Sequence, residues 1–365
     1  MSAVIVLLFP NVSYPKRFYS EFPEKMYEKC SASGLSLRAL YRTHNSDLEP
    51  WVDPETVTVE RLYKPAWCYR TLRRLCANHA QAIIHQHTVP IHSALWPVCA
   101  LMGRKYKTVF SDYDPPTPLA GKHCNGKQWL KRSMRNMRLY PDWIAPVSEF
   151  NARVWATHFG HDRIRPIRHG VIASDQPSAR SAPARRPWSV AFIGRMMWTK
   201  GVKEVMEAAQ LARQYALPVH FNIYGDGPQA SYISESIVRK NLIDLCTYHG
   251  SSRAMESVYA SSDVVLVPSQ FDDPCPMVSL EAMSHGVPVI YSHRGGIPEC
   301  QVNGETGIMM AHGTAAEIAH ALQEMIGDPD RYRKMSLSAR RRYEASFTMD
   351  RMVDDYMRLY QELLQ

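Results

Sequence analysis

Short apolar runs alternate with amphipathic stretches along the whole chain of 365 residues. The runs are as short and continuous as strands that are buried on both faces, and most of the stretches between them carry apolar residues at helical spacing. This alternation predicts an α/β protein built from parallel sheets with helices on both faces. We expect strands at 3–9, 35–41, 82–86, 106–110, 143–147 and 164–168, and then at 188–194, 218–224, 263–267 and 287–291.

One stretch interrupts the alternation. Residues 173–187 are rich in Ala, Ser, Pro and Arg and show no hydrophobic period, which is typical of a linker. We therefore expect two doubly wound domains, residues 1–172 and 188–347, with a ligand cleft at the carboxyl ends of their strands. The last segment, 348–365, has apolar residues at helical spacing, and this helix either packs on its own domain or crosses back to the first one.

The composition excludes several classes of protein. The hydrophobic fraction of 45% is that of a folded chain, and no apolar run reaches the ~18 residues that span a bilayer. The apolar segment 3–9 lacks the basic start and the cleavage site of a signal peptide, so we interpret it as a buried strand. The eight cysteines show no Cys-x-x-Cys spacing, which favours reduced thiols in a cytoplasmic protein.

The net charge of +8 is unevenly distributed. Residues 1–172 carry the whole basic excess, because the rest of the chain has more acidic than basic residues. The first half therefore either binds an anionic partner, such as a phosphorylated carrier or a membrane surface, or has a solvated basic surface without a partner. A nucleic acid is not expected, because basic and aromatic residues do not interleave as they do in a groove for single strands.

The stretch 264–290 has the most informative pattern. An apolar strand at 264–267 ends in the polar loop 268–273, and a helix begins near Pro276 and ends near His285. The start of this helix therefore lies at the edge of the sheet where ligands bind.

Two features of this helix suit a ligand. The N–H groups of Met277 and Val278 have no intrahelical acceptor, and the positive end of the helix dipole lies behind them, which suits a phosphate or a sugar hydroxyl. Glu281 lies one turn further on the same face. Because its carboxylate would repel a phosphate, it suits a neutral diol such as a ribose.

A second cluster begins the C-terminal domain. The strand at 188–194 ends in Gly194, where a diphosphate could approach the backbone closely. Arg195 and Lys200 then supply a planar guanidinium and a mobile ammonium group for phosphate oxygens. Two solvated cations at a helix start are the alternative, but a helix N-terminus repels cations.

Together these elements resemble the signature of the retaining glycosyltransferases of family 4, which have the GT-B fold. The matching residues are the acidic pair Asp273 and Glu281, then Ala282-Met283 and Gly286-Val287-Pro288-Val289, and the earlier Gly194-Arg195 and Lys200-Gly201. The resemblance implies that Glu281 binds the ribose of the nucleotide and Asp273 the transferred sugar. It further implies that Arg195 and Lys200 neutralise the leaving nucleoside diphosphate.

Weaker motifs follow the order of the same family. Gly225, in the segment 224–228, corresponds to the loop near the nucleotide base, and residues 295–299 resemble the loop that faces the donor. His85 and His87 resemble the family's histidines at a strand end, and they line the cleft or are structural.

Two departures from the family lie in the N-terminal half. Ser111, followed by Asp112, stands where the family commonly has a histidine that touches the sugar, and the first loop, 10–15, lacks the family's glycine pair. They indicate a different sugar or a loss of activity.

Residues 112–114 and 328–330 both spell Asp-x-Asp, a pattern of metal-dependent glycosyltransferases. Because Arg195 and Lys200 can balance the diphosphate, we expect no metal and no cofactor beyond the nucleotide sugar.

Segment 127–139 separates into an apolar and a basic face. It either packs on the core with its basic face in water or lies on anionic lipid, which would suit a membrane-linked acceptor.

We therefore expect a GT-B enzyme that transfers a hexosyl residue with retention from a nucleoside-diphosphate sugar, UDP by default, to a hydroxyl acceptor. The acceptor would be a glycan or glycolipid precursor of the cell surface, held by the N-terminal domain, and the enzyme would be cytoplasmic or peripheral on the inner face of the membrane. Two alternatives share the fold: a nucleotide-sugar 2-epimerase or phosphorylase, which the pattern of cations and ribose carboxylate disfavours, and a catalytically inactive nucleotide-sugar-binding module, which Ser111 and the glycine-free loop favour.

Overall fold

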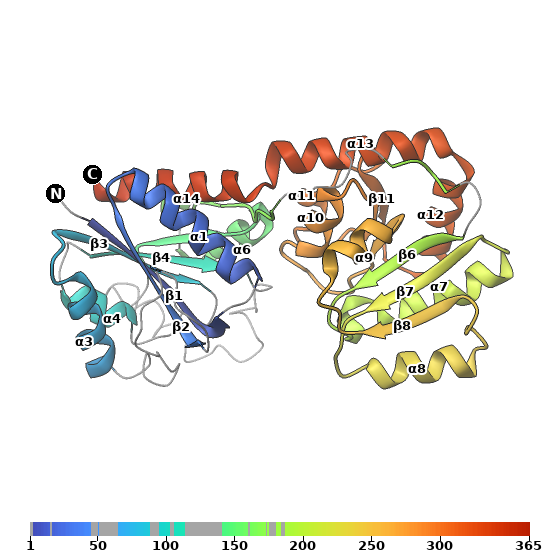
Figure 1. Ribbon diagram of the computed structural model, residues 1–365, viewed down its shortest axis with the longest axis horizontal. Coiled ribbons are helices and arrows are strands. Elements are labelled where there is room, and N and C mark those ends of the chain that lie inside the picture. The colour runs from blue at the N-terminus through green and yellow to red at the C-terminus, as the bar shows by residue number, and fades with distance from the viewer. Residues whose placement is uncertain are drawn as a thin grey trace. The chain divides into compact units, whose positions relative to one another are not determined.

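The computed structural model describes residues 3–14, 17–44, 50, 65–87, 95–102, 106–113, 141–159, 161–172, 174, 180–183 and 187–365. The chain forms two compact units, of which unit 1 consists of Met1–Arg168 and Met349–Gln365 and unit 2 of His169–Thr348. Figure 1 shows that each unit has its own sheet. Segment 127–139 and Asp114, which carry the membrane and metal hypotheses, lie outside the described residues.

Unit 1 is built on a parallel sheet with the strand order β2-β1-β3-β4-β5. Its strands are β1 (Ala3–Tyr14), β2 (Ser36–His44), β3 (Gln81–His87), β4 (Tyr106–Asp112) and β5 (Trp143–Pro146). Its described helices are α1 (Arg17–Ala32), α3 (Pro65–Cys76), α4 (Leu95–Met102), α6 (Glu149–Phe159), the 3₁₀ turn η1 (His161–Arg163) and α14 (Met349–Leu364).

Successive side chains of the strands in unit 1 point to opposite faces of the sheet. Val4, Val6 and Leu8 of β1 pack in one core cluster with side chains of α3 and α4. On the other side, α14 packs against both α1 and β3, as Figure 1 shows. The last helix of the chain is therefore part of unit 1.

Unit 2 is built on a parallel sheet with the strand order β11-β10-β9-β6-β7-β8. Its strands are β6 (Trp188–Ile193), β7 (Val219–Tyr224), β8 (Cys246–Gly250), β9 (Val264–Val267), β10 (Val289–Ser292) and β11 (Gly307–Met310). Its helices are η2 (Trp198–Lys200, a 3₁₀ turn), α7 (Val202–Gln214), α8 (Ala230–Arg239), α9 (Met255–Ser261), α10 (Met277–Ser284), α11 (Ile297–Cys300), α12 (Ala315–Gly327) and α13 (Pro329–Ser346).

The two faces of this second sheet are covered by different helices. Val190 and Phe192 of β6 belong to a core cluster with α7, α8 and α12, whereas Ala191 between them belongs to a cluster with α9 and α10. The sheet is thus buried on both faces, which is why its central strand β9 is an uninterrupted apolar run. The expected doubly wound α/β architecture is confirmed.

Several strand boundaries differ from the prediction. Residues 10–14, expected in a loop, continue β1, with a register irregularity between Phe9 and Ser13. Residues 164–168 are not a strand, although Ile164 bridges to Ile144 and Arg165 donates to the same residue. The sequence did not predict β8 and β11, which lie at the two edges of their sheet and are too short, or too polar in the case of β8, to form a clear apolar run.

Within the expected linker 173–187, the structure describes residues 174, 180–183 and 187. Arg180 is firmly attached there, since its guanidinium donates hydrogen bonds to the carbonyl oxygens of Tyr259, Ala260, Ser262 and His285. The linker is thus pinned to the C-terminal ends of α9 and α10, where a cation is favourable. No helix of the described part is long and apolar enough to cross a membrane.

Candidate functional site

Glycines shape the edge of the sheet where β6 and β7 end. A Cβ atom on Gly225 would lie 1.8 Å from the carbonyl oxygen of Gly194, and one on Gly227 would lie 2.6 Å from that of Met196. These two loops therefore contact each other through their backbones, which requires glycine. A Cβ atom on Gly194 would meet nothing within 4 Å, so the backbone at the end of β6 is open.

Two predicted cations follow Gly194 in the sequence. Arg195 is exposed. Lys200 ends the 3₁₀ turn η2, and its Nζ lies 2.6 Å from Oδ2 of Asp273 and 4.7 Å from the ring centre of Phe271. The structure therefore brings together two of the predicted catalytic residues, Lys200 and Asp273, as an ion pair.

The carboxylate that pairs with Lys200 is nearly buried. The side chain of Asp273 is 8% exposed, against 32% for that of Lys200. Its backbone carbonyl accepts a hydrogen bond from the N–H of Gly296, and a Cβ atom on Gly295 would lie 2.6 Å from that carbonyl oxygen. The loop 295–299 is therefore packed on the loop before α10.

Asp272, the neighbouring carboxylate, has a different role. Its Oδ1 accepts a hydrogen bond from the N–H of Gly295 at 3.1 Å, and the residue is exposed. Asp272 thus stabilises the turn of the loop 295–299, while Asp273 forms the ion pair with Lys200. This division favours Asp273 as the functional carboxylate of the two.

The predicted helix is α10, and it begins one residue later than Pro276. Pro276 is its N-cap with extended backbone angles, φ −69° and ψ 114°, and its side chain caps nothing. For the N–H groups of Met277 and Val278 the described residues offer no hydrogen-bond acceptor. These two N–H groups and the helix dipole give the site the capacity to bind an anion or a hydroxyl group.

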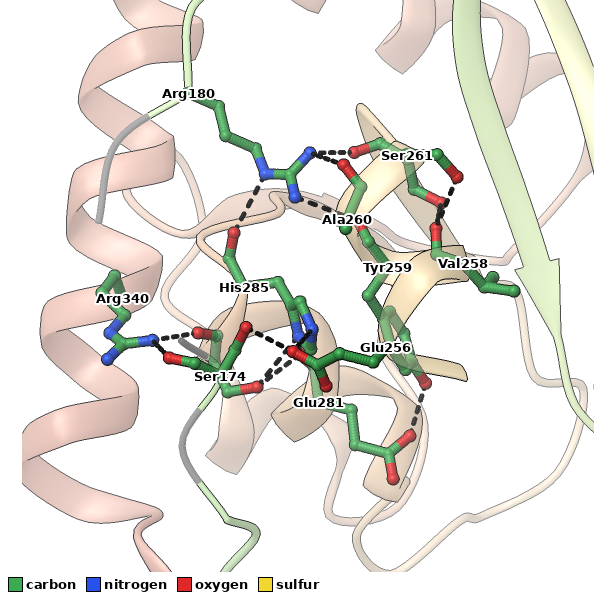
Figure 2. Close-up of polar contacts among 12 residues, drawn as sticks. Ser174, Arg180, Glu256, Val258, Tyr259, Ala260, Ser261, Glu281, His285 and Arg340 are labelled. Atoms are coloured by element: carbon green, nitrogen blue, oxygen red, sulfur yellow. Dashed lines mark hydrogen bonds and ion pairs between the residues drawn. The ribbon is translucent and has the colours of Figure 1, made fainter. Parts of the chain in front are cut away.

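Glu281 lies on the same helix, and its carboxylate has a defined protein partner. The hydroxyl of Tyr259, on α9, donates a hydrogen bond of 2.5 Å to Oε2 of Glu281, as Figure 2 shows. A tyrosine hydroxyl can donate to an ionised carboxylate, which only accepts. The sequence did not identify Tyr259, because it lies on the apolar face of a helix and looks like an ordinary core residue.

Behind α10, a histidine faces oxygen atoms through both of its ring nitrogens. Nδ1 of His285 lies 2.8 Å from the carbonyl oxygen of Glu281, and Nε2 lies 2.8 Å from Oε1 of Glu256. Glu256 also accepts a hydrogen bond from the hydroxyl of Ser174 at 2.7 Å (Figure 2). Burial lowers the pKa of His285, and the nearby carbonyl and Glu256 oppose this shift. The contact between Glu256 and His285 connects α9 with the C-terminal end of α10.

In unit 1, His85 and Ser111 lie in a buried polar cluster beneath α14. His85 Nε2 lies 2.7 Å from Oγ of Ser111, which in turn lies 2.6 Å from the hydroxyl of Tyr356, and His85 Nδ1 contacts the hydroxyl of Tyr360. Complete burial lowers the pKa of His85 to about 3, so its ring is neutral. This arrangement favours the structural interpretation of His85.

The other two candidates of unit 1 are also engaged by neighbouring side chains. His87 Nδ1 lies 2.5 Å from the hydroxyl of Tyr113, and the ring stacks on Phe9 at 4.6 Å. Asp112 Oδ2 accepts a hydrogen bond of 2.7 Å from Nε1 of Trp155 and one of 3.3 Å from Nδ2 of Asn151. The roles of these residues toward a sugar or an acceptor stay predictions.

The two Asp-x-Asp patterns differ in what the structure describes. In the second pattern Asp328 is the N-cap of α13 and accepts a hydrogen bond of 2.9 Å from the N–H of Arg331. In the first, Asp112 accepts from Trp155 and Asn151 as above. The described residues contain no group of three or more His, Cys, Asp or Glu side chains placed to hold a metal ion.

Comparison with known proteins adds independent information. Residues 175–342 match the family model of the glycosyl transferases group 1. The glycogen synthase of Mycobacterium tuberculosis is 27% identical over 190 residues, which cover 52% of this chain and 46% of that protein. The alpha-maltose-1-phosphate synthase of Mycolicibacterium smegmatis is 24% identical over 319 residues, which cover 78% and 81% of the two chains. The chain thus spans about half the length of the first of these relatives.

Two solved structures resemble the whole chain. A glycosyltransferase from Rickettsia africae superposes with a TM-score of 0.76 at 14% identity, covering 100% of this chain and 99% of that one. HepE of Anabaena in complex with UDP-glucose superposes with a TM-score of 0.74 at 17% identity, covering 98% and 99%. At such identities the likeness shows the fold, and the fold is GT-B, as the sequence predicted.

Proposed function

We propose that this chain, whose residues 175–342 match the family model of the glycosyl transferases group 1, transfers a hexosyl residue from a nucleoside-diphosphate sugar to a hydroxyl acceptor. The observation that carries the proposal is the cluster at the edge of the second sheet. There the Lys200–Asp273 ion pair and Glu281 accompany a helix N-terminus whose first two N–H groups have no acceptor in the described part. UDP is the default nucleotide, because HepE of Anabaena, a structural neighbour, was solved with UDP and with UDP-glucose.

The chemistry follows from the charges of these groups. The departing nucleoside diphosphate gains negative charge, which Arg195, Lys200 and the start of α10 would stabilise in place of a metal ion. Glu281 would hold the ribose and Asp273 the transferred sugar. We assign no side chain as the nucleophile. The leaving phosphate would take the proton of the acceptor on the same face of the sugar, which retains the anomeric configuration.

The pairing of Lys200 with Asp273 adds a detail to this scheme. Before the donor binds, the ammonium group neutralises a nearly buried carboxylate. A bound diphosphate would share that ammonium group and leave the carboxylate to accept hydrogen bonds from the sugar. Asp273 would thereby connect donor binding to the orientation of the sugar.

The acceptor side of the proposal rests on the sequence. The basic excess of residues 1–172 and the two-faced segment 127–139 favour an anionic, membrane-linked glycan or glycolipid precursor, held by unit 1 at the inner face of the membrane. We expect the protein to sediment with anionic vesicles and to be released as the salt concentration rises. Equal recovery with neutral vesicles would contradict this part of the proposal.

A panel of nucleoside diphosphates tests the donor assignment. At a concentration of ~100 Kd, the cognate nucleotide should stabilise the folded protein by about 2.7 kcal/mol, and UDP should do so more than GDP, ADP or TDP. Thermal melts measure this shift directly. If none of the nucleotides changes the melting temperature, the donor site is wrongly assigned.

A further inference from the structure

One buried tyrosine connects the core of unit 2 to the carboxylate that we assign to the ribose. The side chain of Tyr259 is fully buried, and its hydroxyl reaches Oε2 of Glu281 at 2.5 Å. The two residues lie on different helices, α9 and α10, and Figure 2 shows the tyrosine side chain extending from α9 to the carboxylate.

The tyrosine itself is held on three sides. Its ring packs in the core cluster with Ala282 of α10, and it lies 5.1 Å from the ring of His285. Its backbone carbonyl accepts a hydrogen bond of 3.1 Å from the guanidinium of Arg180 (Figure 2). The hydroxyl therefore occupies a fixed point, because neither the ring nor its helix can shift without breaking these contacts.

A glutamate near a helix start has several staggered rotamers, and each places the carboxylate at a different point. A fixed hydroxyl that donates to one oxygen of the carboxylate selects a single rotamer. Ribose recognition needs the carboxylate oxygens at the distance of a hydrogen bond from the diol, so a wrong rotamer costs affinity.

We propose that Tyr259 is a positioning residue that fixes the Glu281 carboxylate for the ribose of the donor nucleotide. The proposal rests on the assignment of Glu281 under the proposed function. It predicts that Tyr259 acts on ligands that contain a ribose and not on the diphosphate alone, a distinction that a merely structural role would not produce.

The test is calorimetric titration of the full chain with UDP and with inorganic pyrophosphate. Tyr259→Phe keeps the ring and removes the hydroxyl, so the Kd for UDP should rise about five- to tenfold while the Kd for pyrophosphate stays the same. In a Glu281→Gln background, which weakens UDP binding by itself, Tyr259→Phe should cause little additional loss.

Tyr332→Phe is the matched control. Tyr332 is another fully buried tyrosine of unit 2, and its hydroxyl donates to the backbone carbonyl of Asp263 at 2.9 Å, away from Glu281. It should lower the melting temperature about as much as Tyr259→Phe does and leave UDP binding unchanged.

The outcomes distinguish the positioning role of Tyr259 from the assignment of Glu281 to the ribose. If Glu281→Gln weakens UDP binding and Tyr259→Phe does not, the positioning role is overturned while the ribose assignment stands. If Tyr259→Phe weakens UDP and pyrophosphate equally, its effect is general and the positioning role is again overturned. If Glu281→Gln binds UDP as well as the wild type does, the ribose assignment is wrong and the role of Tyr259 falls with it.

Discussion

The Lys200–Asp273 ion pair leads us to predict that removing the negative charge of Asp273 improves the binding of an anion. Asp273→Asn keeps the size of the side chain and removes the negative charge that competes with phosphate for the ammonium group 2.6 Å away. The variant should therefore bind UDP and pyrophosphate more tightly than the wild type, although it should orient the sugar less well.

The expected gain follows from the geometry. Two unit charges ~4 Å apart attract by about 4 kcal/mol at an effective dielectric constant of ~20. The side chain of Lys200 is 32% exposed, so solvent screens much of this attraction. A net attraction of about 1 kcal/mol between Asp273 and Lys200 remains, and it opposes the binding of phosphate. Removing it should lower the Kd for pyrophosphate about fivefold.

Calorimetric titration with pyrophosphate measures the change, and Asp272→Asn is the control. That variant removes the same charge from the adjacent residue, whose carboxylate accepts from Gly295. Asp272→Asn should change the Kd for pyrophosphate much less, because the carboxylate of Asp272 acts on Lys200 only at a longer range. An unchanged or higher Kd for Asp273→Asn would refute the idea that this carboxylate and the diphosphate share Lys200.

Three further predictions concern stability and metal. Arg180→Met should lower the free energy of unfolding by about 3 kcal/mol in urea titration, because four carbonyl oxygens lose a charged donor, whereas the exposed Arg294 should tolerate the same change. Burial lowers the pKa of both His85 and His169 to about 3. Between pH 6.5 and pH 3, these histidines are therefore protonated in the unfolded chain and neutral in the folded one. Stability should thus be complete above pH 6.5 and fall as the pH drops, by about 2 kcal/mol per histidine at pH 5, and His85→Gln should flatten the profile. Sugar transfer should persist in excess EDTA, and a loss that Mg²⁺ restores would make Asp112 and Asp114 candidate metal ligands.

The element from β9 to α10 could be predicted from the sequence because it is local. The apolar strand β9, the polar loop after it, Pro276 and the stop at His285 follow one another within one short stretch, and each carries its own signal. The same holds for the end of β6 at Gly194. Short-range rules were sufficient for these two elements.

The contacts between these elements could not be predicted in the same way. Lys200 contacts Asp273 although 73 residues of sequence separate them, because β6 and β9 are neighbours in the sheet. In the chain, η2, α7, β7, α8, β8 and α9 lie between these two strands. Tyr259 and Glu281 meet because α9 and α10 share one face of that sheet. His85 contacts Tyr360 of α14, which lies 275 residues later in the chain. The sequence around His85 therefore could not predict that this helix covers the histidine.

We propose that a nucleotide sugar reacts at the cluster of Lys200, Asp273, Glu281 and the start of α10, and that Arg195 stabilises the departing diphosphate there. The most direct measurement is the rate at which UDP is released from UDP-hexoses by the wild type and by Arg195→Ala, in the presence of EDTA. We expect slow release by the wild type and a rate about a hundredfold lower in the variant, because roughly 3 kcal/mol of stabilisation of the departing diphosphate is lost. Arg195→Lys should recover little, since an ammonium group cannot replace the planar fork. Release by Arg195→Ala at the wild-type rate would contradict the placement of the donor site, and no release by the wild type would favour an inactive binding module.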